Sequence, residues 1–220
     1  MRNGPFEFGL RMSVIRLRDG GLVLHSPVRL TPELRAELDA LGPVRGVIAP
    51  SRAHHLFAGD YPAGYPDCLL FAAPGLPEKR PDLKFAAELS DEAAPLWRAE
   101  LEQHVFRGAP FMNEVVFFHP ASRTILFTDL VFNLPPAGMG NFASRVFFRL
   151  LGANGRFGPH RMVKYVFLRD RAAARESLER ILRWDFERVI MTHGDVLEHG
   201  GREAVRAAFA YLGPSGGAGL

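Results

Sequence analysis

Short apolar runs of strand length recur along the chain, and Gly, Pro or polar turn residues bound each of them. They predict strands over residues 10–17, 22–24, 44–49, 67–72, 114–118, 124–129 and 188–191. The turn at 18–21, which contains Asp19-Gly20, predicts a hairpin, and the turn at 119–123 predicts a second one. Residues 101–106 fit either an edge strand or a helix end, and residues 161–168 have the pattern of a further strand.

Helical periodicity and end signals predict four helices. Thr31 is a candidate N-cap followed by Pro32 in the first turn, and leucines at helical spacing continue this helix to Gly42. Asp170 caps a second helix that runs to Trp184. The other two cover residues 142–151 and about 201–212. We expect one domain over residues 1–212, with a Gly- and Phe-rich lid or packing insertion at about 134–160 and a flexible tail over 213–220.

Composition excludes several classes of protein. With 47% hydrophobic and 23% charged residues, the chain of 220 residues is typical of a globular protein with a sizeable core. Cys68 is the single cysteine, so neither an intrachain disulfide nor a cysteine-based zinc cluster is expected. The first eight residues lack the apolar core of a signal peptide, and no apolar run reaches membrane-spanning length. These features predict a cytoplasmic protein that does not interact with membranes.

The net charge of +3 is unevenly distributed. Residues 141–188 hold eleven Lys or Arg against five acids, which makes this segment +6 and the remainder −3. Such a segment fits either an anionic partner or a solvated arginine-rich face. No nucleic-acid-binding motif is present, so the expected partner is a small-molecule substrate, and anionic groups would suit Arg52, Arg156 or Arg161. The phenylalanines at 117–118, 127, 132 and 147–148 fit either core packing or contacts within a homo-oligomer.

Four apolar runs each end at or just before a residue that can bind a metal. They deliver His25, the pair His54 and His55, Asp129, and His193. If these strands share one edge, imidazole and carboxylate groups converge there, as suits Zn, Fe, Mn or Ni. His160 follows Gly158-Pro159 in the predicted lid and is a further histidine of interest.

The second hairpin adds a geometric expectation. A turn symmetric about Ala121 and Ser122 makes paired residue numbers sum to 243, which places Glu114 opposite Asp129. Facing carboxylates repel unless one is protonated, they diverge, or a cation lies between them. An asymmetric turn would instead point Glu114 into solvent, and the sequence leaves both arrangements open.

Over residues 12–212 the chain resembles the metallo-β-lactamase superfamily in the order of its elements. That order is a strand, a hairpin, a helix, a strand, a His-rich loop, a strand ending in Thr-Asp and a strand ending in Thr-His-Gly. The resemblance implies an α/β (α+β) fold, an αββα sandwich of two mixed sheets flanked by helices. The family's first loop reads His-x-His-x-Asp-His, whereas this chain has Pro50-Ser51-Arg52-Ala53-His54-His55. His54 thus stands at the family's Asp and His55 at its last His, and two of the usual histidines are missing.

Elsewhere the resemblance maps further residues onto family positions. Asp129 matches the metal-bridging Asp and His193 the last ligand, whereas Glu114 falls near the middle His and His25 at a structural Asp. With two ligands lost, the resemblance implies one divalent ion, Zn or Fe, held by His55, Asp129 and His193 with help from His54 or Glu114.

The expected function is a metal-dependent hydrolase, in which His25 or His54 transfers protons and Asp129 acts at the ion. Two alternatives stay open. One is a non-haem iron redox or sensor protein, and the other is a binding domain that has lost the metal.

Overall fold

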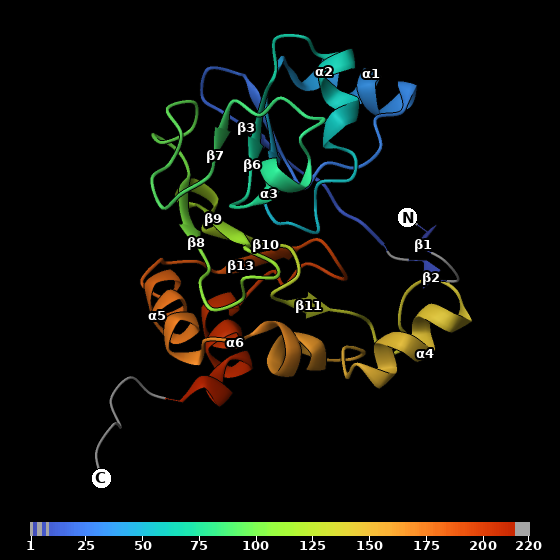
Figure 1. Cartoon of the computed structure of the whole chain (residues 1–220), viewed down its shortest axis with the longest axis vertical. Helices are drawn as coiled ribbons and strands as arrows, with labels where there is room; N and C mark the ends of the chain where they lie inside the picture. Colours follow the sequence, from blue (N-terminus) through green and yellow to red (C-terminus); the bar gives the residue numbers. More distant parts are fainter. Residues whose placement is uncertain (1, 4–5, 8, 214–220) are drawn as a thin grey trace.

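Two β-sheets pack face to face and helices cover their outer faces, as the computed structural model shows (Figure 1). The structure describes residues 2–3, 6–7 and 9–213, so residues 214–220 of the predicted tail lie outside the described part. The predicted αββα sandwich of two mixed sheets is confirmed.

The first sheet has the strand order β3-β4-β5-β6-β7. Its strands are β3 (Ser13–Arg16), β4 (Leu22–His25), β5 (Val44–Ala49), β6 (Leu69–Ala72) and β7 (Ala87–Glu88). β3 and β4 form the predicted antiparallel hairpin, and β4 to β7 run parallel to one another. The carboxyl ends of β4, β5 and β6 therefore lie at one edge of the sheet.

The second sheet has the order β13-β10-β9-β8. It consists of β8 (Glu102–Val105), β9 (Val115–His119), β10 (Thr124–Phe127) and β13 (Arg188–Met191). β9 and β10 are antiparallel, with Ile125 opposite Phe118 and Leu126 opposite Phe117. This is the register in which residue numbers sum to 243. β10 and β13 run parallel, so Asp129 and His193 follow neighbouring strand ends.

Alternating side chains of the strands fill three apolar layers. Between the sheets, Val23, Ile48 and Phe71 of the first sheet meet Val115, Phe117 and Leu126 of the second. Neighbouring positions pack outward, since a strand turns successive side chains to opposite faces. Leu22 and Leu24 thus pack near Leu38 of α1 (Pro32–Leu41), while Val116 and Phe118 belong to the layer that also holds Leu178 of α5 (Arg171–Ile181) and Val205 of α6 (Gly201–Ala208).

Shorter elements connect these layers. They are β1 (Arg2–Asn3), β2 (Phe6–Glu7), the 3-10 helices η1 (Ala58–Asp60), η2 (Pro120–Ser122) and η4 (Ala210–Leu212), and the helices α2 (Tyr61–Gly64) and α3 (Leu76–Lys79). Residues 132–158 contain β11 (Phe132–Asn133), α4 (Phe142–Leu150) and β12 (Phe157–Gly158), and β11 pairs with β12.

The predicted strand over 161–168 is wrong. The segment forms a π-helix, η3 (Val163–Phe167), in which the Leu168 N–H donates to the Val163 carbonyl oxygen. Its β-branched and aromatic residues favour a strand locally, but the fold packs Val163 and Phe167 as one face against the core below the second sheet. For residues 101–106 the edge-strand alternative is confirmed by β8.

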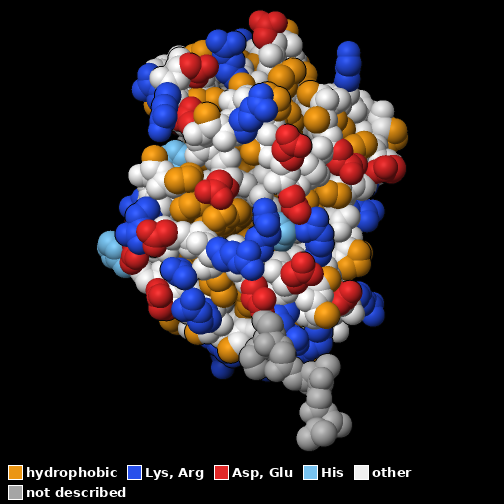
Figure 2. Space-filling view, turned by 90° about the vertical axis from the view of Figure 1, so that its left-hand side faces the viewer, with side chains coloured by type: hydrophobic (Ala, Val, Ile, Leu, Met, Phe, Trp, Pro, Cys, Tyr) orange, Lys and Arg blue, Asp and Glu red, His pale blue; other side chains and the backbone are white. Residues whose placement is uncertain are grey.

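Charges of both signs alternate over the face that carries β8 and α5 (Figure 2). On this face the basic excess of residues 141–188 forms no continuous field, as expected for a solvated arginine-rich surface. Among the described residues, none of the helices combines the length and the apolar character needed to cross a lipid bilayer.

Candidate metal centre

Three side chains from both sheets converge at the edge where the parallel strands end. The His54 Nε2 atom lies 3.1 Å from Asp129 Oδ2, and the His193 Nε2 atom lies 3.3 Å from Asp129 Oδ1. One ligand atom of each residue lies within 4.8 Å of the other two, and this is the one such group among the described residues. The carboxylate therefore sits between two imidazoles, which come from different sheets.

A turn stabilised by Ser51 orients the two adjacent histidines after β5. The Ser51 Oγ accepts hydrogen bonds from the Ala53 N–H (3.3 Å) and the His54 N–H (3.1 Å). His54 is thereby directed to Asp129, whereas the His55 Nδ1 lies 3.0 Å from Arg80 Nη1. The structure therefore brings His54, not His55, to the cluster with Asp129 and His193. The expectation of a shared site for His55 is corrected, because consecutive residues of the turn point to different neighbours.

Burial and cationic neighbours make His55 a poor base. Its side chain is buried, and desolvation followed by the charges of Lys79 and Arg80 lowers its pKa to about 4. In the same loop, the Arg52 carbonyl oxygen accepts a hydrogen bond from Lys79 Nζ (2.6 Å).

Two hydroxyl groups support His54 from behind. The Ser26 Oγ lies 3.0 Å from His54 Nδ1, and the Thr192 hydroxyl donates to Ser26 Oγ over 3.3 Å. Ser26 has φ of 58°, a left-handed conformation that L residues adopt rarely. A hydrogen-bonded outer partner of this kind fixes ring orientation and tautomer in metal-binding histidines. Only its place at the end of a strand could have marked Ser26 as a candidate before the structure was known.

The backbone around His193 is held from several sides. The His193 Nδ1 donates to the Gly9 carbonyl oxygen (2.7 Å), and Arg11 Nη1 donates to the carbonyl oxygens of Met191 (2.8 Å) and Gly194 (2.7 Å). Gly194 has φ of 100°, and a Cβ atom there would lie 2.2 Å from the Asn133 carbonyl oxygen. The Thr-His-Gly turn therefore needs its glycine for close packing against β11.

Glu114 does not reach the cluster as a ligand. Its carboxylate accepts hydrogen bonds from the backbone N–H groups of Thr128 (2.6 Å), Asp129 (2.8 Å) and Leu130 (3.0 Å). Burial, and next the charge of Asp129, raise the pKa of Glu114 to about 7. The Glu114 carboxylate thus faces the backbone of residues 128–130, whereas the Asp129 carboxylate faces the two histidines. Glu114 fixes the backbone from which Asp129 projects.

Asp129 itself stays ionised. Its burial would raise the pKa, but the neighbouring His54 and His193 outweigh burial and hold the pKa well below its usual range. An anion between two imidazoles has the charge that a metal ion requires.

The hydrogen-bond pattern of His193 tests whether these residues suit a cation. Because the Gly9 carbonyl can only accept, His193 Nδ1 must bear a proton, and the neutral ring then directs the bare lone pair of Nε2 at Asp129 Oδ1, 3.3 Å away. Two acceptors face each other unless a proton or a metal ion lies between them. The donor set of two imidazoles and a carboxylate therefore fits a divalent ion such as Zn or Fe.

An aromatic wall lies beside the cluster. The Phe132 ring stacks on His193 with centroids 5.2 Å apart, and its other neighbour is His160, at 4.6 Å. The Val163 N–H donates to His160 Nδ1 over 3.3 Å, which leaves the proton of a neutral ring on Nε2. Burial lowers the pKa of His160 to about 4 and outweighs the opposing charge of Asp129. The fold thus brings His160 toward the centre.

His25 occupies the core side of the same edge. It is 2% exposed, its ring packs edge-on to Phe117, and its Nε2 has no hydrogen-bond partner in the described part of the chain. Burial, followed by the charge of His54, lowers the pKa of His25 to about 3. Its burial and lowered pKa disfavour the proton-transfer role that the sequence suggested.

Solved structures similar to this chain support the fold. The metallo-β-lactamase DIM-1 has a TM-score of 0.59 and 12% identity over 91% of this chain and 83% of its own. The metallo-β-lactamase IND-7 has a TM-score of 0.61 and 13% identity over 95% of this chain and 89% of its own. The Flv1 flavodiiron core from Synechocystis sp. PCC6803 has a TM-score of 0.61 and 14% identity, over 92% of this chain and 52% of its own. Identities this low establish a metallo-β-lactamase fold alone.

Sequence comparison assigns the family. No curated protein sequence matches the chain at a significant level. A sequence-family profile described as "Domain of unknown function (DUF4336)" matches residues 5–141, which is more than half of the chain and includes His54 and Asp129. The chain therefore belongs to the DUF4336 family, and its fold is that of the metallo-β-lactamases.

Proposed function

We propose that this protein is a metal-dependent hydrolase with a mononuclear centre formed by His54, Asp129 and His193. The observation that supports the proposal is the position of the Asp129 carboxylate between two imidazole nitrogens, 3.1 and 3.3 Å away. Three protein ligands leave one position open for water or substrate, as catalytic zinc sites do. The missing histidines of the first loop favour one ion over two.

A divalent ion held there would lower the pKa of a bound water and polarise a carbonyl or phosphoryl oxygen of the substrate. The residues of this chain orient the centre. Ser26 and the Gly9 carbonyl fix the two rings, and Glu114 fixes the Asp129 backbone. Phe132 shields one side of His193 from water. The neutral His160 retains a proton on Nε2 and is the candidate hydrogen-bond donor to substrate.

A redox function on iron is the second candidate. Two histidines and one carboxylate form the facial triad of non-haem Fe(II) enzymes, and the chain is similar in fold to a flavodiiron core. Iron in the native protein, with oxygen consumption, would favour this candidate over hydrolysis.

Metal analysis of matched variants tests the proposal. Protein purified without added metal, and again after reconstitution with Zn²⁺ or Fe²⁺, should contain one ion per chain. His54→Ala and His193→Ala should lose it, whereas His55→Ala should keep it, because His55 binds Arg80 instead. Panels of esters, lactones and phosphodiesters then identify the reaction. No ion after reconstitution would refute the proposal and favour a binding domain that has lost its metal.

A further inference from the structure

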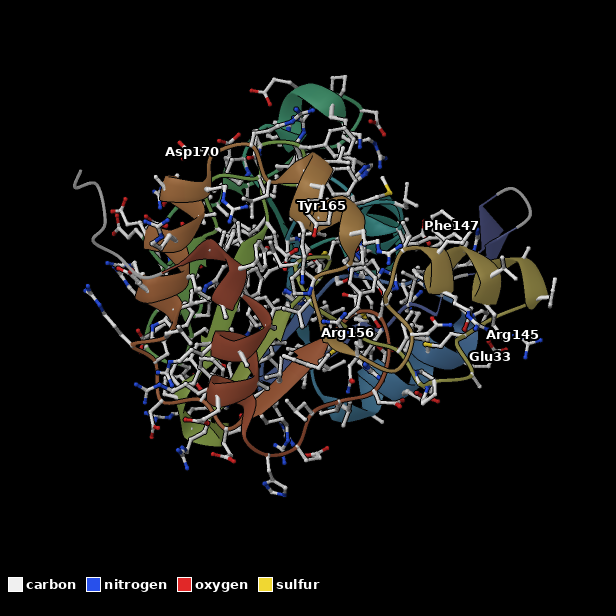
Figure 3. The ribbon with its side chains drawn as sticks, turned by 90° about the horizontal axis from the view of Figure 1, so that it is seen from below. Glu33, Arg145, Phe147, Arg156, Tyr165 and Asp170 are labelled. Carbon is white, nitrogen blue, oxygen red and sulfur yellow. The ribbon has the colours of Figure 1, made fainter. Side chains whose placement is uncertain are left out.

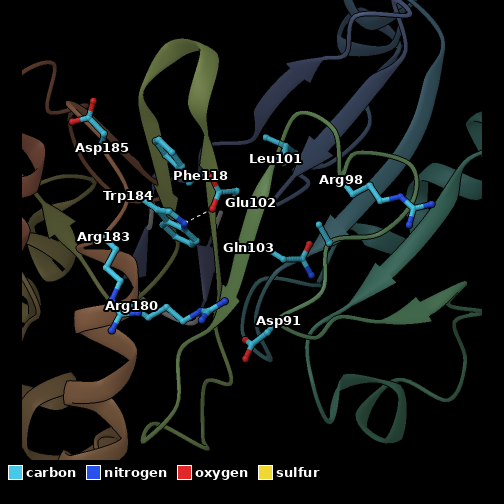
Figure 4. Close-up of a pocket in the computed structure, with 11 residues that line it drawn as sticks. Asp91, Arg98, Leu101, Glu102, Gln103, Phe118, Arg180, Arg183, Trp184 and Asp185 are labelled. Carbon is cyan, nitrogen blue, oxygen red and sulfur yellow. Dashed lines mark hydrogen bonds between the residues drawn. The ribbon is translucent and has the colours of Figure 1, made fainter.

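Two hollows of opposite character lie away from the His54–Asp129–His193 cluster. The larger, of about 620 Å³, lies between the edge of the second sheet and α5 (Figure 4). Its charges balance, and its acids already have partners. Asp91 pairs with Arg107 (2.6 Å), Glu102 accepts from Trp184 Nε1 (2.6 Å), and Asp185 pairs with Arg123 (2.9 Å). A hollow with this balance has no evident ligand preference.

The smaller hollow, of about 130 Å³, contains cations without acids. It is bounded by the loop before and through β12, by η3, and by the end of α6 with η4. Its lining consists of Gly152, Arg156, Phe157, Gly158, Pro159, Lys164, Ala207, Ala208 and Tyr211. Figure 3 shows Arg156 between α6 and α4 on the face seen from below. We call this hollow the β12 cleft.

Arg156 and Lys164 of the β12 cleft repel each other. Burial, and next the charge of Arg156, lower the pKa of Lys164. Neither side chain forms an ion pair with a carboxylate within residues 9–213, and the closest described partner of Lys164 Nζ is the Tyr211 ring, 4.8 Å from its centroid. Two neighbouring cations without a counter-charge favour an anion between them.

Tyr211 lines the cleft and carries a hydrogen-bond donor without a described partner. Its hydroxyl is buried and has no hydrogen-bond partner in the described part of the chain. Burial raises the pKa of Tyr211 to about 12, so the hydroxyl keeps its proton and can donate. A buried hydroxyl without a partner is costly, and native proteins usually satisfy such groups with water, an ion or a ligand.

The backbone around the cleft is also unusual. Lys164 lies in the π-helix η3, a form that is rare and often found at functional sites. Gly152, Gly155 and Gly158 have positive φ angles of 69°, 68° and 132°, so the loop folds back on itself. At Gly158 a Cβ atom would lie 2.9 Å from Ala208 Cβ, so the glycine lets the loop pack against α6.

We propose that the β12 cleft binds a phosphoryl group, held by Arg156, Lys164 and the Tyr211 hydroxyl. A phosphate monoester has a charge of −1.5 to −2 at neutral pH and would neutralise both cations, which a carboxylate cannot do. The volume equals about four water molecules, enough for one group of this size.

The cleft is connected to the candidate metal centre through one strand. β12 pairs with β11, with Gly158 opposite Phe132, and Phe132 contacts both His160 and His193. A phosphoryl group in the cleft would therefore immobilise the segment that carries His160. The proposal stands independently of hydrolase activity, because binding in the cleft requires no metal.

Calorimetric titration of metal-free protein with inorganic phosphate at low ionic strength tests the cleft. The chelated wild type and His193→Ala should bind phosphate equally well, which separates this site from the metal centre. Arg156→Gln and Lys164→Gln should each weaken binding roughly tenfold or more, through loss of a charged hydrogen bond. Arg183→Gln, the same change at an exposed arginine of the larger hollow, is the matched control and should leave binding unchanged.

Tyr211→Phe separates ligand binding from a structural role. Because the hydroxyl has no described partner, the variant should unfold at the wild-type denaturant concentration and yet bind phosphate several-fold more weakly. No saturable binding in the millimolar range, or equal losses in Arg183→Gln and Arg156→Gln, would overturn the proposal. Acetate binding as tightly as phosphate would overturn the assignment of a phosphoryl group.

Discussion

The candidate metal centre and the β12 cleft gather charged groups in opposite ways. At the metal centre, each functional side chain follows a strand end, and backbone groups hold it. Three N–H groups bind Glu114 beneath Asp129, and carbonyl oxygens hold His193 and Arg11. In the cleft, the cations lie on a glycine-containing loop and a π-helix, and neither has a described carboxylate partner.

The candidate metal centre is therefore a pre-organised site, whereas a ligand would order the β12 cleft. Sheet backbone is fixed by neighbouring strands, so the fold itself holds the histidines and the carboxylate in place. Arg156 and Lys164 have no described counter-charge, so a bound anion would order them. Variants should therefore affect stability at the metal centre and ligand binding at the cleft.

The largest effect is expected at Glu114. Glu114→Ala leaves three buried N–H groups without an acceptor and should lower the free energy of unfolding by at least about 3 kcal/mol. Glu114→Gln, which keeps the side-chain volume and one acceptor oxygen, should cost less. Urea denaturation of both variants measures this, and equal stability of Glu114→Ala and wild type would show that the strand-end backbone needs no support.

Acid should destabilise the metal-free protein through His25. The folded state keeps His25 neutral because burial lowers its pKa from 6.5 to about 3, whereas the unfolded chain takes up a proton below pH 6.5. The contribution of His25 is thus present above pH 6.5 and declines by about 2 kcal/mol between pH 6.5 and 5. The stability difference between His25→Leu and wild type, measured by denaturation at both pH values, should change by this amount. A constant difference would contradict the prediction.

Loss of the hydroxyl behind His54 should weaken metal binding without abolishing it. Ser26→Ala removes the partner of His54 Nδ1, and outer partners of metal-binding histidines contribute 10- to 100-fold in affinity. Competition with a chelator measures the affinity, and His55→Ala is the control with an unchanged value. Wild-type affinity in Ser26→Ala would mean that His54 is not a ligand.

The smallest effect on stability is expected at Tyr211. Tyr211→Phe removes a hydroxyl that has no described partner, so the free energy of unfolding should change by less than about 0.5 kcal/mol. A larger loss would reveal a hydrogen bond to an ordered water or ion. The cleft would then resemble the metal centre, where hydrogen bonds already hold the functional groups. Thermal unfolding in buffers with and without phosphate measures it.

Periodic apolar patterns predicted most of the two sheets. The hairpin of β9 and β10 shows why, since the symmetric turn set the register and placed Glu114 close to Asp129. An element whose local pattern conflicts with its packing was predicted wrongly. Local propensity favoured a strand over 161–168, but no described strand pairs with this segment, which packs as the π-helix η3.

At the site, residue type and strand ends identified His54, Asp129 and His193 as candidates, together with His25, His55 and Glu114. The structure separated them. His54 and His55 are adjacent and chemically identical, so residue type could not distinguish them. The resemblance to the family favoured His55. In the structure, the Ser51 turn directs His54 to Asp129. Ser26, Gly9 and Arg11 were missed because their roles depend on contacts between residues distant in sequence.

By itself, the sequence determined which residues end the buried strands, because alternation and turn chemistry are local properties of the chain. Tertiary structure decided which of those residues meet. Asp129 and His193 follow parallel neighbours of one sheet, and His54 reaches them from the other. It also decided which cations have no carboxylate partner in the described part of the chain, as at Arg156 and Lys164. Pairing and burial depend on segments far apart in the chain, and only packing of the two sheets and their helices brings those segments together.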